Sequence, residues 1–208
     1  MREILCYGDS NTWGWDPEKK ARYPREIRWT GVLQSELGED YHVIEEGQNG
    51  RTTVWDDPIE GYKNGLEYLY PCLETHKPLD LVIIMLGTND LKYRFSVSSY
   101  DIAKGMGRLI DVVQKSDTGK NNKSPELLVI APPPLGKLTE FAEMFQFGTE
   151  KSKTLAIHYS NICKEKGCHF LDAGTVIKSS DIDGIHLEAE EHKKLGRAVA
   201  KAVKRIIG

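Results

Sequence analysis

Residues 79–90 read LDLVIIMLGTND. The stretch Leu79–Leu86 is apolar at every position except Asp80, and it ends at Gly87. A continuous apolar run of this length predicts a strand that is buried on both faces, as in the centre of a parallel sheet covered by helices. The polar residues Thr88, Asn89 and Asp90 follow at the carboxyl end of this strand.

Shorter apolar runs on either side of this stretch predict four more strands, at Ile4–Tyr7, Tyr41–Ile44, Leu127–Ala131 and His169–Leu171. Apolar residues at helical spacing alternate with these runs and predict five helices, at Trp29–Leu37, Gly65–Leu73, Asp101–Lys115, Phe147–Lys166 and Glu188–Ile207. Alternating strands and helices imply right-handed crossovers. The chain is therefore predicted to be a three-layer α/β/α sandwich with a five-stranded parallel sheet.

Length and composition narrow the function classes. The 208 residues suit a single domain over 1–208, and 39% hydrophobic with 28% charged residues is typical of a soluble globular protein. A net charge of -3 argues against a nucleic-acid-binding protein, and the longest apolar run is too short to cross a membrane. The N-terminal sequence has no apolar signal region, so a cytoplasmic protein is expected.

Cysteine and histidine usage gives no indication of a metal or cofactor. The four cysteines are scattered and are expected to be reduced thiols. Only Cys163 and Cys168 are close together, and a Cys-x4-Cys pair without a second pair is a poor zinc signature. The six histidines are dispersed, with no two at ligand spacing. We therefore expect neither a metal nor a cofactor.

Polar blocks follow the predicted strands. They are Gly8-Asp9-Ser10, the turn-rich Gly47–Thr53, Gly87–Asp90, and Asp183-Gly184-Ile185-His186 before the last helix. Ligands of open α/β sheets bind at the carboxyl ends of the strands, so these blocks are expected to meet at one site.

The four blocks in this order resemble those of the SGNH, or GDSL-type, hydrolases, and the similarity covers nearly the whole chain. Asn11 departs from the family pattern, in which a leucine follows Gly-Asp-Ser. Within the family the chain is most similar to the arylesterase/acyltransferase branch, through the segments 13–15, 28–33, 45–47, 51–53 and 80–86. The resemblance implies a flavodoxin-like sheet and a serine hydrolase.

The resemblance implies that Ser10 is the nucleophile. A serine needs a base within hydrogen-bond reach, for which His186 is the candidate, and Asp183 would hold the imidazole in the required tautomer. The Asp-x-x-His spacing fits, because three residues in one turn allow both side chains to point into the same pocket. The other five histidines are expected to be structural or exposed.

The family pattern assigns the oxyanion hole to the backbone N–H groups of Ser10 and Gly50 and to the side-chain amide of Asn89. Gly47 is a second candidate for the glycine, but Gly50 directly precedes the Arg-Thr-Thr segment that matches the branch. Beside these residues, Asp9 is expected to cap a helix or to steady the site by hydrogen bonds, and Asp90 is expected to support its loop.

Aromatic residues beside the blocks suggest how substrate is bound. Trp13 and Trp15 follow the serine and are candidates for lining an apolar acyl pocket. The long segment 132–147, which includes Phe141, Phe145 and Phe147, is expected to form a lid or an oligomer contact. The branch implies a homo-oligomer, with an octamer as one form, and the loop Trp55–Tyr62 is a second candidate contact.

The predicted function is that of a serine esterase acting on short-chain acyl esters through an acyl-enzyme on Ser10. Water would resolve the intermediate by hydrolysis, an alcohol by transesterification and hydrogen peroxide by perhydrolysis. The predicted partners are thus a small ester and a water or alcohol acceptor. Alternatives are a carbohydrate or other polar-ester deacetylase, a flavodoxin-like phosphate- or flavin-binding module, and an inactive interaction domain.

Overall fold

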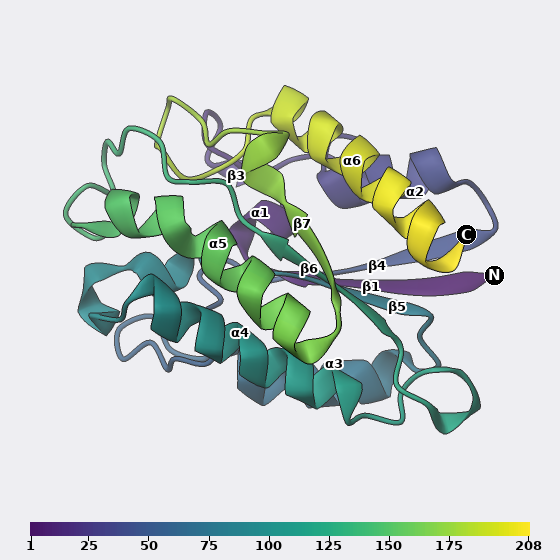
Figure 1. Ribbon diagram of the computed structural model, residues 1–208. Helices are drawn as coiled ribbons and strands as arrows, with labels where there is room; N and C mark the ends of the chain where they lie inside the picture. The colour runs from purple at the N-terminus through teal and green to yellow at the C-terminus, as the bar shows by residue number, and fades with distance from the viewer.

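A parallel sheet of five strands forms the centre of the computed structural model, which describes all 208 residues (Figure 1). In chain order the strands are β1 (Arg2–Gly8), β4 (Tyr41–Gly47), β5 (Leu81–Met85), β6 (Glu126–Ala131) and β7 (His169–Asp172). Their spatial order is β4-β1-β5-β6-β7, and each neighbouring pair is parallel. The predicted sheet is confirmed.

Both faces of the sheet are buried, which explains the continuous apolar runs. In β5, Val82 and Ile84 belong to a core of 26 buried residues on one face. Leu81, Ile83 and Met85 belong to a second core of 20 residues on the other face. Successive side chains of a strand point to opposite faces, so a strand covered on both sides must be apolar at every position.

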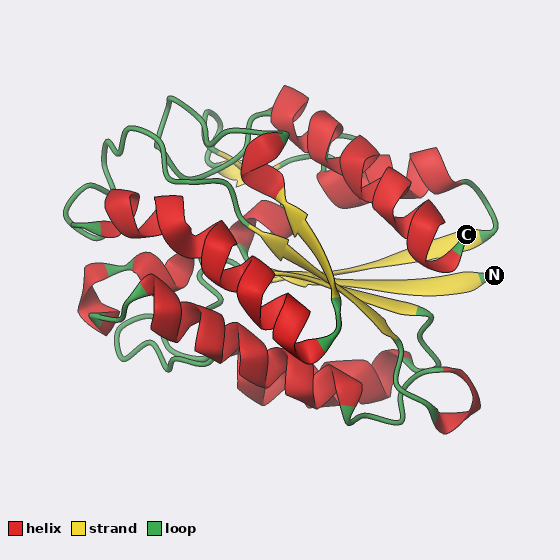
Figure 2. Ribbon diagram, in the orientation of Figure 1, coloured by secondary structure: helices red, strands yellow, loops and turns green.

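Helices cover the two faces unequally (Figures 1 and 2). One face packs against α3 (Gly65–His76), α4 (Ser99–Gln114) and α5 (Gly148–Lys166), and the other packs against α2 (Trp29–Leu37) and α6 (Ala189–Ile207). The observed layers are those of the predicted sandwich.

The structure differs locally from the predicted elements. The central strand starts at Leu81 rather than Leu79, because the Asp80 carboxylate accepts the backbone N–H of Glu3 at 2.9 Å and pairs with Lys120. A small antiparallel ribbon of β2 (Trp15–Asp16) and β3 (Ala21–Arg22) was not predicted. Its strands of two residues are too short to produce an alternating pattern.

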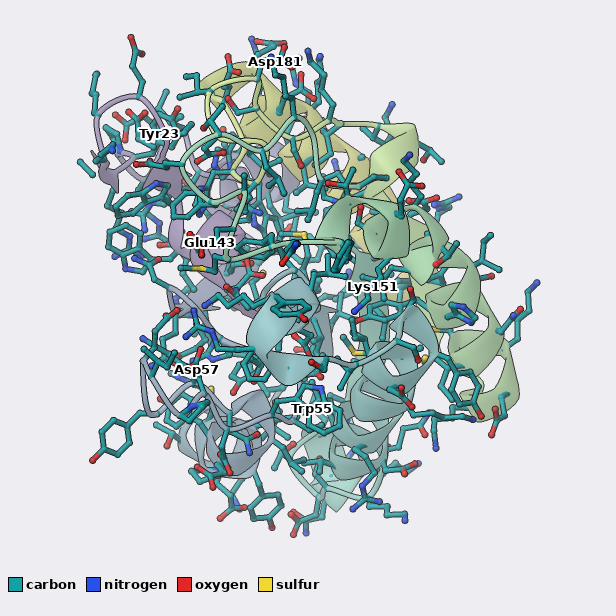
Figure 3. All side chains as sticks on the ribbon, turned by 90° about the vertical axis from the view of Figure 1, so that its left-hand side faces the viewer. Tyr23, Trp55, Asp57, Glu143, Lys151 and Asp181 are labelled. Atoms are coloured by element: carbon teal, nitrogen blue, oxygen red, sulfur yellow. The ribbon has the colours of Figure 1, made fainter.

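Long loops gather at the carboxyl ends of the strands, on the left in Figure 1 and facing the viewer in Figure 3. Asp57 and Glu143, labelled in Figure 3, mark two of them, the loop 48–64 and the segment 132–147. A third loop carries Tyr23. In none of the helices is there an apolar stretch long enough to span a membrane.

Candidate active site

Ser10 lies at a sharp turn from β1 into the short helix α1 (Ser10–Trp13). Asp9 caps this helix, since its Oδ1 accepts the backbone N–H of Asn11 at 2.9 Å. The turn requires glycine at position 8: a Cβ there would lie 2.1 Å from Oγ1 of Thr12 and 2.9 Å from the carbonyl oxygen of Met85. The tight packing of strand and helix holds the Ser10 hydroxyl at the carboxyl end of β1.

Ser10, His186 and Asp183 form a hydrogen-bonded chain of buried side chains. The Oγ of Ser10 lies 3.0 Å from Nε2 of His186, and Nδ1 of His186 lies 2.6 Å from Oδ2 of Asp183. Asp183 Oδ1 also accepts the backbone N–H groups of Ile185 at 2.8 Å and His186 at 2.9 Å. With the ring proton on Nδ1, Nε2 is free to accept the serine proton, which is the arrangement that activates a serine as a nucleophile.

Electrostatics keep the Asp183 carboxylate ionised. Burial alone would raise its pKa, but hydrogen bonds and attraction from His186, with the backbone N–H of Ile185, outweigh burial and lower it. A carboxylate in this state orients the imidazole and stabilises its protonated form.

Asn11 joins the nucleophile turn to the loop that carries His186. Its Nδ2 donates to the carbonyl oxygen of Ile185 at 3.3 Å, and its Oδ1 accepts the backbone N–H of Leu187 at 3.1 Å. This residue replaces the leucine of the family pattern, and a leucine could make neither bond. The position of His186 relative to Ser10 is therefore fixed by a side chain whose role the sequence did not predict.

Three residues with unpaired N–H donors line the cavity at Ser10. The backbone N–H groups of Ser10 and Gly50 donate to no protein acceptor. The side-chain amide of Asn89 donates one N–H to the carbonyl oxygen of Arg51 at 3.2 Å, which leaves its second N–H available. Ser10, Gly50 and Asn89 all line one cavity. Gly47 lies instead inside β4, where a Cβ would come within 2.2 Å of the backbone nitrogen of Trp13.

Buried charges hold the loop of Gly50 against the sheet. The Arg51 guanidinium donates to the carbonyl oxygen of Gly8 at 2.8 Å and lies 4.1 Å from the ring centroid of Tyr7. The Asp90 carboxylate accepts the backbone N–H of Thr53 at 3.1 Å and its hydroxyl.

Asp9 and Asp90 are the acids buried deepest beneath the site. Burial raises the pKa of Asp9 to about 6, although hydrogen bonding from Asn11 opposes the rise. Burial, reinforced by repulsion from Asp9, raises the pKa of Asp90 to about 6. The Asp9 carboxyl caps α1, and the Asp90 carboxyl supports the loop at Thr53, as expected.

The cavity at Ser10 has a volume of about 260 Å³. Its apolar wall includes Trp15 and Phe141, whose ring centroids lie 5.8 and 6.2 Å from that of His186. The lining consists of Ser10, Trp15, Asn49, Gly50, Glu60, Asn89, Lys92, Phe141, Met144, Phe145, Ile185 and His186. The segment 132–147 thus supplies three side chains to this wall.

Trp13 does not line this cavity. Its ring lies 6.2 Å from that of Trp15, and the guanidinium carbon of Arg22 lies 5.0 Å from its centroid. Trp15 therefore lies at the site, whereas Trp13 packs against Trp15 without reaching the cavity.

A charged cluster that reaches the cavity through Lys92 and Glu60 was not predicted. The ammonium group of the buried Lys92 binds the Glu60 carboxylate and lies 3.7 Å from Asp57, which also pairs with Arg94 at 2.9 Å. Asp57 accepts the backbone N–H of Ile59 at 2.9 Å as well. These contacts fasten the loop 55–62 beside the cavity.

The remaining histidines lie outside the cavity lining. His192 is fully buried, accepts the backbone N–H of Trp29 on Nδ1 at 3.2 Å, and has its pKa lowered to about 3 by burial. His42, His76 and His169 each pair with a glutamate.

The chain is similar to a known protein family and to several solved structures. Residues 6–194 match the model of the GDSL-like lipase/acylhydrolase family. Solved structures that align over 100% of both chains include the M. smegmatis aryl esterase (45% identity, TM-score 0.95), Est24, a carbohydrate acetylesterase from Sinorhizobium meliloti (46%, 0.96), and a putative arylesterase from Agrobacterium tumefaciens (40%, 0.92). A search of curated protein sequences gives no match.

Proposed function

Because the chain belongs to the GDSL-like lipase/acylhydrolase family and is an ester-hydrolysing enzyme, we propose that Ser10, His186 and Asp183 are its catalytic triad. The observation that carries this assignment is the hydrogen-bonded chain from Ser10 Oγ through His186 to Asp183. Because the chain is an ester-hydrolysing enzyme, two of the alternative functions lose their support: a flavodoxin-like binding module and an inactive interaction domain.

The mechanism has two steps. Ser10 Oγ attacks the ester carbonyl carbon while its proton passes to Nε2 of His186, which then protonates the leaving alcohol as the acyl-enzyme forms. An acceptor, deprotonated by the same nitrogen, attacks the acyl-enzyme and releases Ser10. Negative charge on the carbonyl oxygen in each step is stabilised by the N–H groups of Ser10, Gly50 and Asn89.

Removal of one oxyanion donor tests the last assignment. Asn89→Ala is expected to lower kcat for p-nitrophenyl acetate about 10² to 10³-fold, with a much smaller change in KM, because the amide acts mainly on charge in the transition state. Asn64, which caps α3, provides a matched control, and Asn64→Ala should retain kcat. A kcat for Asn89→Ala within threefold of wild type would remove this residue from the oxyanion hole.

We propose short-chain acyl esters as substrates, with Trp15 as a substrate-binding residue. A volume of about 260 Å³ lies below the usual range for pockets that hold drug-sized ligands, roughly 300 to 1,000 Å³. Trp15 and Phe141 pack beside His186, where a bound acyl group would lie. The Trp13 side chain would act indirectly, by supporting Trp15.

We further propose that the acyl-enzyme is resolved by alcohols as well as by water. The apolar wall restricts water at the intermediate and offers an alcohol contact surface. The test uses p-nitrophenyl esters of increasing acyl length, each with and without an added alcohol. We expect the acetyl or propionyl ester to give the highest kcat/KM and the alcohol to yield a new ester. If only hydrolysis products form, the proposal of acyl transfer to alcohols is wrong. Perhydrolysis is tested separately, with hydrogen peroxide as the acceptor.

A polar-ester deacetylase is the second candidate function. Two observations favour it: the similarity to the carbohydrate acetylesterase Est24, and the polar wall formed by Asn49, Glu60 and Lys92. A higher kcat/KM on acetylated sugars than on aryl acetates would select this alternative.

We propose a homo-oligomer, of which an octamer is one form, in a cytoplasmic setting that suits its four free cysteines. Large apolar side chains are exposed at Ile59 and Tyr62 in the loop 55–62, and in the edge-to-face pair of Tyr93 and Phe147. Light scattering is expected to give a multiple of 23.5 kDa that falls on Tyr62→Arg. A 23.5 kDa wild-type species would contradict the proposal.

A further inference from the structure

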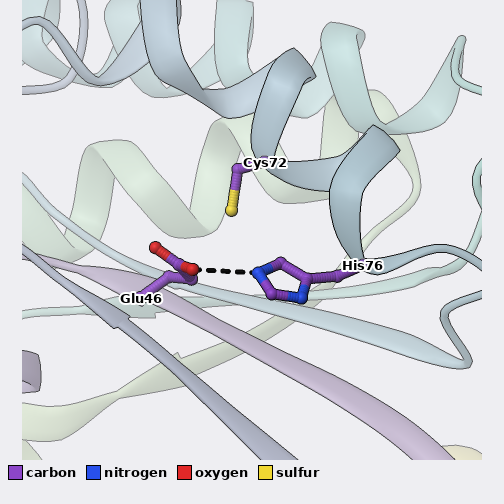
Figure 4. Close-up of side chains that lie close together, drawn as sticks. All are labelled: Glu46, Cys72 and His76. Carbon is purple, nitrogen blue, oxygen red and sulfur yellow. Dashed lines mark hydrogen bonds and ion pairs between the residues drawn. The ribbon is translucent and has the colours of Figure 1, made fainter.

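Three side chains of metal-ligating type converge outside the active site (Figure 4). Cys72 and His76 lie one turn apart on α3, so they share a face of the helix, and Glu46 reaches them from the edge strand β4. Nε2 of His76 lies 2.9 Å from Oε1 of Glu46, and one candidate ligand atom from each residue lies within 4.8 Å of the other two.

The cluster has one buried group and two groups that solvent can reach. Cys72 is fully buried, whereas the side chains of His76 and Glu46 are 25% and 22% exposed. An ion could therefore reach the thiol between the two outer groups. None of the three lines the cavity at Ser10.

The donor set fits one class of ligand. Thiolate sulfur, imidazole nitrogen and carboxylate oxygen are the three ligand types that zinc takes in proteins. A thiolate and a carboxylate together carry two negative charges, which balance a divalent cation. Magnesium and calcium prefer oxygen ligands throughout, so a sulfur and a nitrogen donor argue against them.

We propose that Glu46, Cys72 and His76 bind one Zn²⁺ ion, with water as the fourth ligand. Two ligands at about 2.0 to 2.3 Å from a tetrahedral zinc lie roughly 3.4 to 3.7 Å apart. The Glu46–His76 pair would have to open from its hydrogen-bond distance of 2.9 Å, and the Cys72 sulfur would approach both. Rotations of these two partly exposed side chains would open the site, which in the structure is closed by the hydrogen bond between them.

The bound ion would join α3 to the edge of the sheet. In the structure the direct link between Glu46 on β4 and the end of α3 is the hydrogen bond with His76, a partly exposed contact of the kind that contributes little to stability. Metal that binds only the folded state shifts the unfolding equilibrium. Zn²⁺ at about 100 times its dissociation constant should raise Tm by about 5 °C or more for a chain of this size.

The test starts from protein stripped of metal and kept reduced, with Co²⁺ as the spectroscopic probe. Titration is expected to produce a thiolate-to-cobalt charge-transfer band that saturates at one equivalent and disappears when Zn²⁺ is added. The thermal unfolding of the same samples should show the Zn²⁺-dependent rise in Tm.

Variants locate the ion. Cys72→Ser and His76→Gln should lose the cobalt band and the Zn²⁺-dependent Tm shift, and His76→Gln, a change at a partly exposed position outside the cavity, should keep its esterase activity. His42→Gln removes a comparable histidine–glutamate pair on the surface, and Cys168→Ser removes a different thiol; both should bind as wild type does. Absence of a cobalt band in the wild type, or a band that survives in Cys72→Ser and His76→Gln, would overturn the proposal and leave a structural hydrogen bond between Glu46 and His76 only.

Discussion

Ser10→Ala is expected to lower kcat for p-nitrophenyl acetate by at least about 10⁴-fold, to the level of the uncatalysed reaction plus the contribution of the remaining site. The Ser10 hydroxyl is the group that both lines the cavity and lies 3.0 Å from Nε2 of His186, so no other side chain can take over the attack. Alanine suits the first position of α1 and removes a single atom, so the fold should be retained.

Ser99→Ala is the matched control, because Ser99 is also a buried serine at the start of a helix and bonds to the carbonyl oxygen of Lys151 at 2.9 Å. This variant should keep its activity. A fluorophosphonate probe should add to wild type and to Ser99→Ala but not to Ser10→Ala. Retention of more than a tenth of the wild-type kcat by Ser10→Ala, with an unchanged circular dichroism spectrum, would remove Ser10 from the mechanism.

The strands of the sheet could be predicted because burial on both faces leaves an unbroken apolar pattern. The run at Leu79–Leu86 identifies β5 to within two residues, and the error comes from the polar contacts of Asp80. By contrast, the ribbon of β2 and β3 depends on a turn in which Asp16 accepts the backbone N–H groups of Glu18 and Lys19. Such local contacts leave little trace in hydrophobic periodicity.

The proposed triad could be predicted because its residues stand in short motifs at strand ends. The charged part of the cavity lining could not, since Lys92 and Glu60 come from separate loops and meet only in the folded chain. Asn11 carried a signal, its departure from the family's leucine, but its two bonds to the loop of His186 emerge only from the structure.

The proposed zinc site shows the same limit. Cys72 and His76 are four residues apart and could be paired from helical spacing alone. The third ligand, Glu46, lies on another element 26 residues before Cys72, so sequence spacing gives no reason to select it.

Asp183→Asn is expected to lower kcat about 10⁴-fold while the fold is retained. Oδ1 of Asp183 accepts two backbone N–H groups, and the asparagine oxygen can keep these bonds. The amide nitrogen then replaces Oδ2 beside Nδ1 of His186, where it can only donate. Nδ1 must become the acceptor, which moves the ring proton to Nε2 and leaves no base for the Ser10 hydroxyl.

Asp181→Asn is the matched control for this variant. Asp181 lies two residues earlier on the same loop, and its exposed carboxylate pairs with Lys178, outside the cavity. Steady-state kinetics on p-nitrophenyl acetate should give a wild-type kcat for Asp181→Asn and a loss of about 10⁴-fold for Asp183→Asn. If kcat of Asp183→Asn stays within tenfold of wild type, His186 does not depend on Asp183 for its tautomer, and a pair of Ser10 and His186 would have to replace the triad.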